Sequence, residues 1–302
     1  MTFHRSFWIL AMALVFSEAF AAASQTSRSE LEQATQMQSI NPLQSDLRQE
    51  DRFALPDGAA AAAATRAFED LLAKKTPEPG TLSASGLALH DGSGWRALSD
   101  DPHDPAGRGL YAYRPGGFAL MISAPHQFRD LRTGRIAGLL FDELGLEAAA
   151  FNTAPRDLRL ADGSLSDLGK LEGSHFNLFH IAFHGIRPAS RIVQLHGFAR
   201  EKRKSTAGRG ADVIVSNGTR RPDQSAIEVT QCLRRAGFMA LHYPDEVNEL
   251  GGTTNVTLAE LIGAGAPVGT FLHVETSREL RDKLVVDEGL RFVFGSCLGL
   301  GL

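Results

Sequence analysis

Cysteine is scarce in this sequence and charge is nearly balanced, and both features exclude whole classes of protein. The 302 residues include two cysteines, Cys232 and Cys297, too few for a disulfide-rich scaffold or a cysteine-based structural zinc site. The sequence leaves open whether they pair or remain buried thiols. With 31 Lys and Arg against 35 Asp and Glu, the net charge of −4 favours neither a nucleic acid nor an acidic lipid as partner.

A long apolar run is also missing, although a short one lies near the start. His4 and Arg5 precede the apolar segment 7–16 (FWILAMALVF), which is shorter than the roughly 20 residues of a membrane-spanning helix. Residues 19–23 (AFAAA) then offer the small-x-small pattern that signal peptidase cleaves. We therefore predict a cleaved signal peptide at 1–23 and a periplasmic or secreted protein with no stable membrane span.

The rest of the chain divides by composition into two parts. Residues 24–84 are polar and then alanine-rich, which predicts a partly flexible leader containing one helix at 59–72. Residues 85–302 alternate between apolar strand patterns and helical spacing, which predicts one α/β domain with a metal-binding, hydrolase-like core. Strands are expected at 86–89, 95–98, 118–123, 148–152, 191–195, 212–216, 238–243 and 268–274. Further helices are expected at 135–144, 167–183, 225–236 and 257–263, and the last clear helix is expected to open at 277–283.

Several expected strands, such as FALMIS and VIVS, are apolar throughout, as in strands buried on both faces. The predicted fold is therefore a mixed, mostly parallel sheet covered by helices on both faces. In such sheets, ligands bind beyond the carboxyl ends of the strands. Three expected strands run into reactive residues there: FALMIS into His126 and Asp130, RIVQL into His196, and VGTFL into His273 and Glu275.

These residue types point to a catalytic metal ion. His126, Asp130 and His196 supply two imidazoles and a carboxylate, which leave one coordination position open for water, as in hydrolytic zinc sites. Zinc lowers the pKa of its bound water to about 7. Glu275 is expected to accept that water's proton, and His273, on the same strand face, to orient Glu275 or a ligand. The same ligands also accept manganese or cobalt, so the sequence does not fix the metal.

Several segments in this order resemble the N-formylglutamate amidohydrolase and poly-γ-glutamate hydrolase families: ISAPHQFRDLRTGRIAGLL, FNTAPRD, QLHG, GGTTN and FLHVETSRELR. These segments span about residues 115–284. The resemblance implies the phosphorylase/hydrolase-like α/β core of the zinc carboxypeptidases. It also implies His126 and His196 as zinc ligands and Glu275 as general base. Asp130 stands where the families place a carboxylate ligand, usually Glu at a slightly different spacing.

The resemblance further implies residues that contact the substrate. Arg156 resembles an arginine that holds a substrate carboxylate, which a planar guanidinium does bidentately. Arg129 is a second candidate for positioning a carboxylate or stabilising the oxyanion, and Arg220 and Asn255 are lesser candidates. The loop 251–255 (GGTTN) either lines the pocket or is an ordinary glycine turn.

The sequence thus predicts an exported zinc-dependent hydrolase that cleaves an amide bond in a small peptide, an N-acyl amino acid, a γ-glutamyl chain or a cell-wall peptide. Two alternatives stay open. The first is an inactive envelope binding or assembly protein that retains the fold. The second is a serine hydrolase, since Ser123, Ser216 and Ser277 lie near strand ends, although none stands in a Gly-x-Ser-x-Gly motif.

Overall fold

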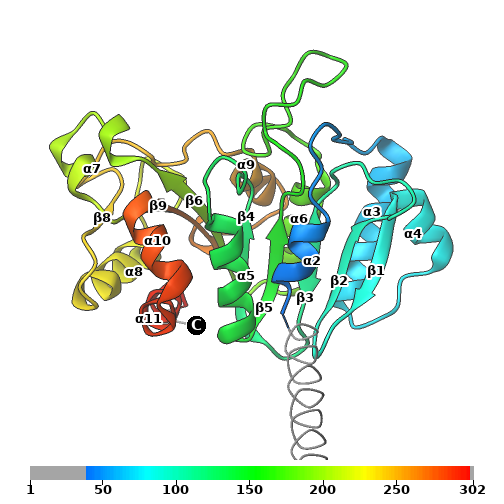
Figure 1. The fold of residues 1–302 in the computed structure, drawn as a ribbon, viewed down its shortest axis with the longest axis horizontal. Coiled ribbons are helices and arrows are strands. Elements are labelled where there is room, and N and C mark those ends of the chain that lie inside the picture. Colours follow the sequence, from blue (N-terminus) through cyan, green and yellow to red (C-terminus); the bar gives the residue numbers. More distant parts are fainter. Residues whose placement is uncertain (1–38, 300–302) are drawn as a thin grey trace, which may run out of the picture. The chain divides into compact units, whose positions relative to one another are not determined.

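A nine-stranded mixed sheet forms the centre of the protein (Figure 1). The structure, a computed structural model, describes residues 39–299, so the predicted signal peptide lies outside the described residues. The strands are β1 (Leu87–Asp91), β2 (Arg96–Asp100), β3 (Leu110–Tyr113), β4 (Phe118–Ala124), β5 (Leu146–Phe151), β6 (Arg191–Phe198), β7 (Val213–Ser216), β8 (Ala240–His242) and β9 (Phe271–Ser277). Their order in the sheet is β1-β2-β3-β5-β4-β6-β9-β7-β8.

The middle of the sheet is parallel and its flanks are partly antiparallel. Strands β5, β4, β6 and β9 run parallel to one another, as do β7 and β8 at one edge. Strands β1, β2 and β3 form an antiparallel meander that joins β5, and β7 is antiparallel to β9. The predicted α/β class is confirmed.

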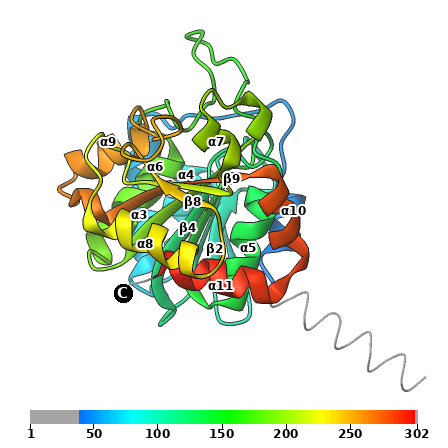
Figure 2. The same cartoon turned by 90° about the vertical axis from the view of Figure 1, so that its left-hand side faces the viewer.

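Helices cover both faces of this sheet (Figures 1 and 2). The helices are α2 (Asn41–Asp46), α3 (Gly58–Leu72), α4 (Pro79–Ser85), α5 (Thr133–Glu143), α6 (His175–Ile186), α7 (Thr206–Gly210), α8 (Gln224–Arg235), α9 (Val256–Gly263), α10 (Arg278–Val286) and α11 (Glu288–Leu298), with 3₁₀ turns η1 (Arg200–Lys202) and η2 (Val268–Thr270). Helices α2, α5, α8, α10 and α11 contribute to one hydrophobic core, and α3, α6 and α9 contribute to the other.

The strands divide their side chains between these two cores with the period of two that a pleated strand imposes. In β4, Leu120 and Ile122 belong to the core under α5, whereas Met121 belongs to the core under α6. This explains why the FALMIS segment is apolar without alternation, since both faces of the strand are buried.

The described part of the predicted leader contains three helices, and the helix expected at 59–72 is confirmed as α3. Its Phe68 packs edge-on against Tyr111 of β3 and against Phe179 of α6, with ring centroids 4.9 and 5.2 Å apart. The residues from Ile40 onward belong to one compact unit. The proposed division of the chain at 84/85 stays a prediction, and residues 24–38 lie outside the described residues.

Two expected elements begin later than predicted. The helix expected from 167 begins only at His175, because Gly173 has a φ of 65° and Ser174 then caps the helix by accepting a bond from the amide of Asn177. The strand expected from 268 begins at Phe271, because η2 follows Pro267. The sequence analysis also missed strand β3, the short helices α2, α4 and α7, and the last helix, α11.

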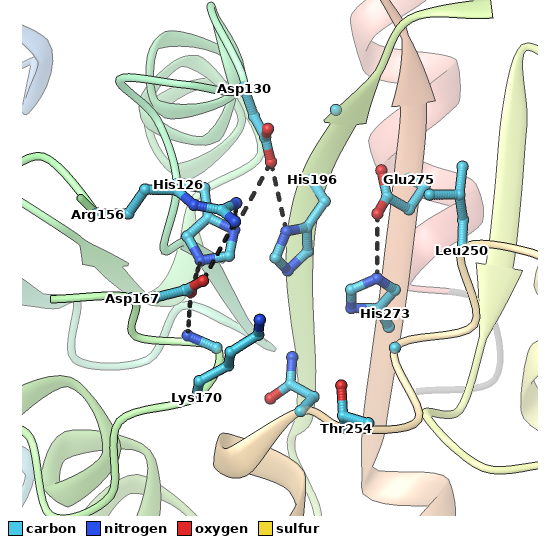
Figure 3. A pocket seen from close by; sticks show the side chains of 14 residues that line it. His126, Asp130, Arg156, Asp167, Lys170, His196, Leu250, Thr254, His273 and Glu275 are labelled. Atoms are coloured by element: carbon cyan, nitrogen blue, oxygen red, sulfur yellow. Dashed lines mark hydrogen bonds and ion pairs between the residues drawn. The ribbon is translucent and has the colours of Figure 1, made fainter. Parts of the chain in front are cut away.

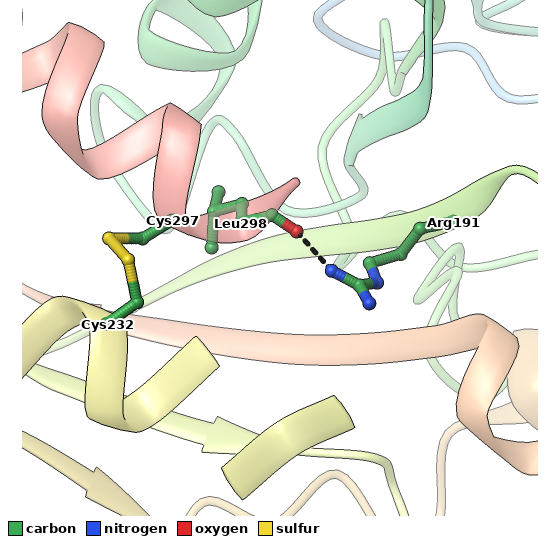
Figure 4. The surroundings of a disulfide bond; sticks show 4 residues. All are labelled: Arg191, Cys232, Cys297 and Leu298. Atoms are coloured by element: carbon green, nitrogen blue, oxygen red, sulfur yellow. Dashed lines mark hydrogen bonds between the residues drawn. A yellow bond between two sulfur atoms is a disulfide. The ribbon is translucent and has the colours of Figure 1, made fainter. Parts of the chain in front are cut away.

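The two cysteines, left open by the sequence, form a disulfide between α8 and α11 (Figure 4). Next to it, the guanidinium of Arg191 donates a 2.8 Å bond to the carbonyl of Leu298, which ties the end of α11 to β6. In the part of the chain that the structure describes, no helix has the length and apolar character that a membrane crossing requires.

Candidate metal centre

A polar pocket opens where β4, β6 and β9 meet the loops above them (Figure 3). Opposite positions of the parallel strands β6 and β9 pair Gln194 with His273 and His196 with Glu275. Because residues two apart point to the same face, these four side chains all project towards the face covered by α6 and α9. The pocket has a volume of ≈260 Å³. Most of the predicted site residues line it, namely His126, Asp130, Arg156, His196, Asn255, His273 and Glu275.

His126 and Asp130 are brought together by a tight turn that ends β4. The amides of Arg129 and Asp130 both donate to the carbonyl of His126, at 2.8 and 2.7 Å. This turn carries the Asp130 carboxylate back towards the imidazole, so its Oδ2 lies 3.9 Å from His126 Nδ1. The short spacing of the two residues in the sequence is therefore what places them in one cluster.

The other ring nitrogen of His126 is occupied by an acid that the sequence analysis missed. His126 Nε2 lies 2.8 Å from Asp167 Oδ1, so it donates its proton to this carboxylate. Arg156 Nη1 lies 3.4 Å from His126 Nδ1. A guanidinium only donates, so Nδ1 carries a lone pair, which accepts from Arg156 and lies 3.9 Å from Asp130 Oδ2. Although burial alone raises the pKa of Asp167, the hydrogen bond with His126 and the charge of Arg156 help to lower it to about 2.

His196 is held in the same way by an amide. Its Nε2 lies 2.8 Å from Gln194 Oε1, and Asn255 donates to the same oxygen. Gln194 Nε2 in turn donates to Thr257 Oγ1, which fixes the orientation of the amide. Since Nε2 carries the proton, the lone pair of Nδ1 faces Asp130 Oδ2 at 3.4 Å. Burial, with the charge of His273, lowers the pKa of His196 to about 4, which favours the neutral imidazole that metals bind.

Two imidazole lone pairs thus converge on one carboxylate oxygen. Ligand atoms from His126, Asp130 and His196 all lie within 4.8 Å of one another. Two donors about 2.0–2.2 Å from a tetrahedral zinc stand about 3.4 Å apart, close to the 3.4 and 3.9 Å found here. Each histidine also has the outer hydrogen-bond acceptor that orients metal-binding imidazoles. The donor set therefore fits a zinc-like ion.

Glu275 and His273 lie beside this cluster on β9. His273 Nε2 is 3.4 Å from Glu275 Oε1, while His273 Nδ1 and Glu275 Oε2 are buried with no hydrogen-bond partner. Ligand atoms of these two residues and His196 also lie within 4.8 Å of one another. A buried carboxylate oxygen without a partner is costly, so Glu275 is suited to bind a water or a ligand inside the pocket.

The loop that follows β8 closes the pocket on this side. Gly252 has a φ of 63°, and a Cβ atom there would lie 2.7 Å from the ring of His273. Asn255 caps helix α9 by accepting from the amide of Leu258, and Thr254 also lines the pocket. Gly252 therefore lets the loop backbone approach His273 closely.

The other predicted site residues and the candidate serines do not line this pocket. Arg129 does not line this pocket but an adjoining one, and Arg220 is exposed and lines neither pocket. Ser123 is fully buried and bonds to His180, Ser216 donates to a loop carbonyl, and Ser277 caps α10. None of these serines lines the pocket, so the geometry gives no support to a serine hydrolase.

The sequence analysis missed three residues of the site. Asp167 contacts His126, Gln194 contacts His196, and Lys170 lines the pocket. Asp167 and Lys170 were placed in an expected helix, and Gln194 was treated as part of a core strand. The glycines at 163, 169 and 173 were the signal that a loop, not a helix, precedes α6.

Gln194 provides a test of this arrangement. Gln194→Met removes the acceptor of the His196 Nε2 proton and is expected to weaken zinc binding about 10- to 100-fold. Gln194→Glu keeps an acceptor oxygen at that position and should bind zinc far more tightly than the Met variant. Competition with a chromogenic zinc chelator measures both affinities, and unfolding of the zinc-free variants separates them from folding defects. Equal affinities of the two variants would contradict the role of Gln194.

Comparisons with known proteins identify no family for this chain. No protein-family model and no curated protein matches its sequence. Among solved structures, the chain is similar to N-formylglutamate amidohydrolase from Ralstonia eutropha JMP134, with 14% identity and a TM-score of 0.36, over 61% of this chain and 91% of that one. It is also similar to a proposed carboxypeptidase from Burkholderia mallei, with 10% identity and a TM-score of 0.36, over 71% of this chain and 62% of that one.

A proposed metallopeptidase from Shewanella denitrificans gives 12% identity and a TM-score of 0.30, over 79% of this chain and 89% of that one. Similarity at this level assigns neither a family nor an activity to the chain. The case for a function therefore depends on the arrangement of its own side chains in the pocket.

Proposed function

We propose that this protein is an exported metal-dependent hydrolase that cleaves an amide bond, with one zinc ion held by His126, Asp130 and His196. The observation that carries this proposal is the convergence of two imidazole Nδ1 atoms on Asp130 Oδ2, at 3.9 and 3.4 Å. Both Nε2 protons have acceptors, so both Nδ1 atoms carry a lone pair, although that of His126 also lies 3.4 Å from Arg156 Nη1. Such a site polarises a carbonyl and supplies hydroxide at neutral pH when zinc is bound.

Glu275 acts as the proton carrier in this proposal. Its free oxygen takes a proton from water and returns it to the leaving amine, and the contact between its other oxygen and His273 limits how the carboxylate can turn. Its position on β9 opposite His196 keeps it beside the ligand cluster. His273 is therefore a positioning residue for Glu275 in this proposal.

Arg156 and Lys170 supply positive charge on the pocket wall. The Arg156 side chain is 36% exposed and is held by Asp167 at 3.2 Å, so its remaining donors can receive a substrate carboxylate or a developing oxyanion. Arg129 lies in the adjoining pocket, so we assign these roles to Arg156 rather than to Arg129. The substrate classes that carry a carboxylate and an amide carbonyl of this kind are small peptides, N-acyl amino acids, γ-glutamyl chains and cell-wall peptides.

Export to the periplasm or the medium is part of the proposal. The signal-like pattern at 1–23 supports it, and so does the disulfide between Cys232 and Cys297, because disulfides persist in oxidising compartments.

Metal analysis with hydrolysis assays tests the proposal. Protein purified without chelators is expected to contain about one zinc per chain and to hydrolyse members of an amide panel made from the four substrate groups above. Removing the metal should abolish hydrolysis, and adding zinc back should restore it. Full activity after stringent metal removal would contradict the proposal.

A further inference from the structure

Helix α2 contacts the turn that carries two of the three candidate metal ligands, residues 126–130, which we call the ligand turn. The helix packs beside α5, which begins three residues after Asp130 (Figure 1). Ile40, directly before α2, is fully buried in the core shared with α5, and its amide donates a 3.1 Å bond to Asp142 of α5. Helix α2 comes well before the segments at 115–284 that resemble the amidohydrolase families. This contact is therefore a feature of the leader of this chain.

One side chain of α2, Gln44, bonds directly to the ligand turn. Gln44 is only 6% exposed, and its Nε2 donates a 2.7 Å bond to Gln127 Oε1. Gln127 directly follows His126 and precedes Asp130 by three residues. Burying a primary amide costs free energy unless the amide is hydrogen-bonded. The bond to Gln127 therefore explains why a polar side chain occupies a buried position of this short helix.

Gln127 connects this bond to the strand ends around His126. Its own Nε2 donates to the carbonyl of Asn152, which follows β5. Asn152 Nδ2 in turn donates a 2.8 Å bond to the carbonyl of Pro125. Since Pro125 and Gln127 flank His126 in the sequence, hydrogen bonds hold the residues on both sides of this histidine. These bonds limit how far its imidazole can move.

Two further features show how closely the leader fits the ligand turn. A Cβ atom at Gly134, in the first turn of α5, would collide with Gln127 Oε1 and lie 2.6 Å from Gln44 Nε2. Glycine at this position therefore leaves the space that the two amides occupy. The guanidinium of Arg48 lies over the ring of Phe128, 4.8 Å from its centroid. The leader thus contacts two successive side chains of the ligand turn.

We propose that Gln44 is a positioning residue for the metal centre, because its bond to Gln127 keeps the ligand turn in the shape that directs both ligands at one ion. This inference rests on the proposed metal-dependent function, which makes His126 and Asp130 ligands. A metal site needs supporting residues that fix its ligands before the ion arrives. If the ligand turn loosens, only a fraction of the zinc-free protein can bind the ion, and the apparent affinity falls by that fraction.

Zinc affinity measured in a double-mutant cycle tests this role. Gln44→Met keeps the length of the side chain and removes the donor, so the Kd for zinc should rise about fivefold, less than for groups that bond a metal ligand directly. Gln127→Met should raise it at least as much. Gln44→Met/Gln127→Met should raise it no further than Gln127→Met alone, because both residues act through one contact. The control Ser45→Ala removes one exposed bond within α2 and should keep the wild-type Kd.

Hydrogen exchange in zinc-free protein separates this inference from the proposed function. The amides of Arg129 and Asp130 bond to the carbonyl of His126, so their exchange reports the opening of the ligand turn. Gln44→Met should speed this exchange about fivefold, and Ser45→Ala should leave it unchanged. If the wild-type protein binds no zinc, the proposed function fails, and the exchange result alone decides whether Gln44 holds the turn. Unchanged exchange in Gln44→Met overturns the inference, and so does an unchanged Kd or an additive loss in a protein that binds zinc.

Discussion

Glu275→Gln is expected to keep zinc and to lose hydrolysis by a factor of about 10² to 10⁴, the contribution typical of a positioned general acid–base group. The substitution preserves the size of the side chain and leaves His126, Asp130 and His196 unchanged. It removes the negative charge of this side chain and with it the ability to accept and return a proton. The readouts are kcat on the best amide of the panel and zinc content measured on the same sample.

The matched control is Glu279→Gln, four residues further along the chain. Glu279 is exposed on α10 and lines neither pocket, so this variant should keep full activity. A Glu275→Gln protein that has lost zinc would show that Glu275 is a ligand rather than a base. That outcome would favour the second group of candidate ligands, formed by His196, His273 and Glu275.

The same variant separates the enzyme from an inactive binding protein. An envelope binding or assembly protein needs the pocket and its charges but no proton transfer. If Glu275→Gln performs the biological role of the wild-type protein in full, the binding alternative gains the support and hydrolysis loses it. If the role disappears together with turnover, while zinc and folding are retained, the protein acts as an enzyme.

The sequence predicted the site best where the position of a residue on a strand determines which other residues it lies beside. His126 and Asp130 could be placed together because they follow one buried strand within a single turn, and His273 and Glu275 because they alternate on another. That His196 would join them depended on β6 lying between β4 and β9 in the sheet. The order of strands in a sheet depends on the whole fold. General rules for α/β proteins make this order plausible, but the sequence itself does not determine it.

The groups that orient the histidines could not be predicted for a different reason. Asp167 reaches His126 across 41 residues, from a loop whose course depends on glycine conformations and on the position of α6. Gln194 is a strand residue whose polar role appears only when Thr257 and Asn255 are packed above it. The pocket that adjoins the metal centre likewise combines η1, α10 and the turn after β4, which no local pattern connects.

The disulfide provides the second large expected effect. It joins α8 to α11 and closes a loop with a sequence separation of 65 residues, which restricts the unfolded chain. A cross-link of this span stabilises a protein by about 4 kcal/mol when the folded state is unstrained. Cys232→Ala/Cys297→Ala should therefore lower the free energy of unfolding by an amount of this order, measured by urea denaturation.

Reductant supplies the control for this effect. If the cross-link itself causes the difference, wild-type protein unfolded in reductant should match the double variant, and the variant should be insensitive to reductant. Zinc affinity under native conditions should be unchanged, because α8 and α11 cover the face of the sheet opposite to His196 and Glu275. A double variant as stable as the oxidised wild type would show that the bond contributes nothing to the fold.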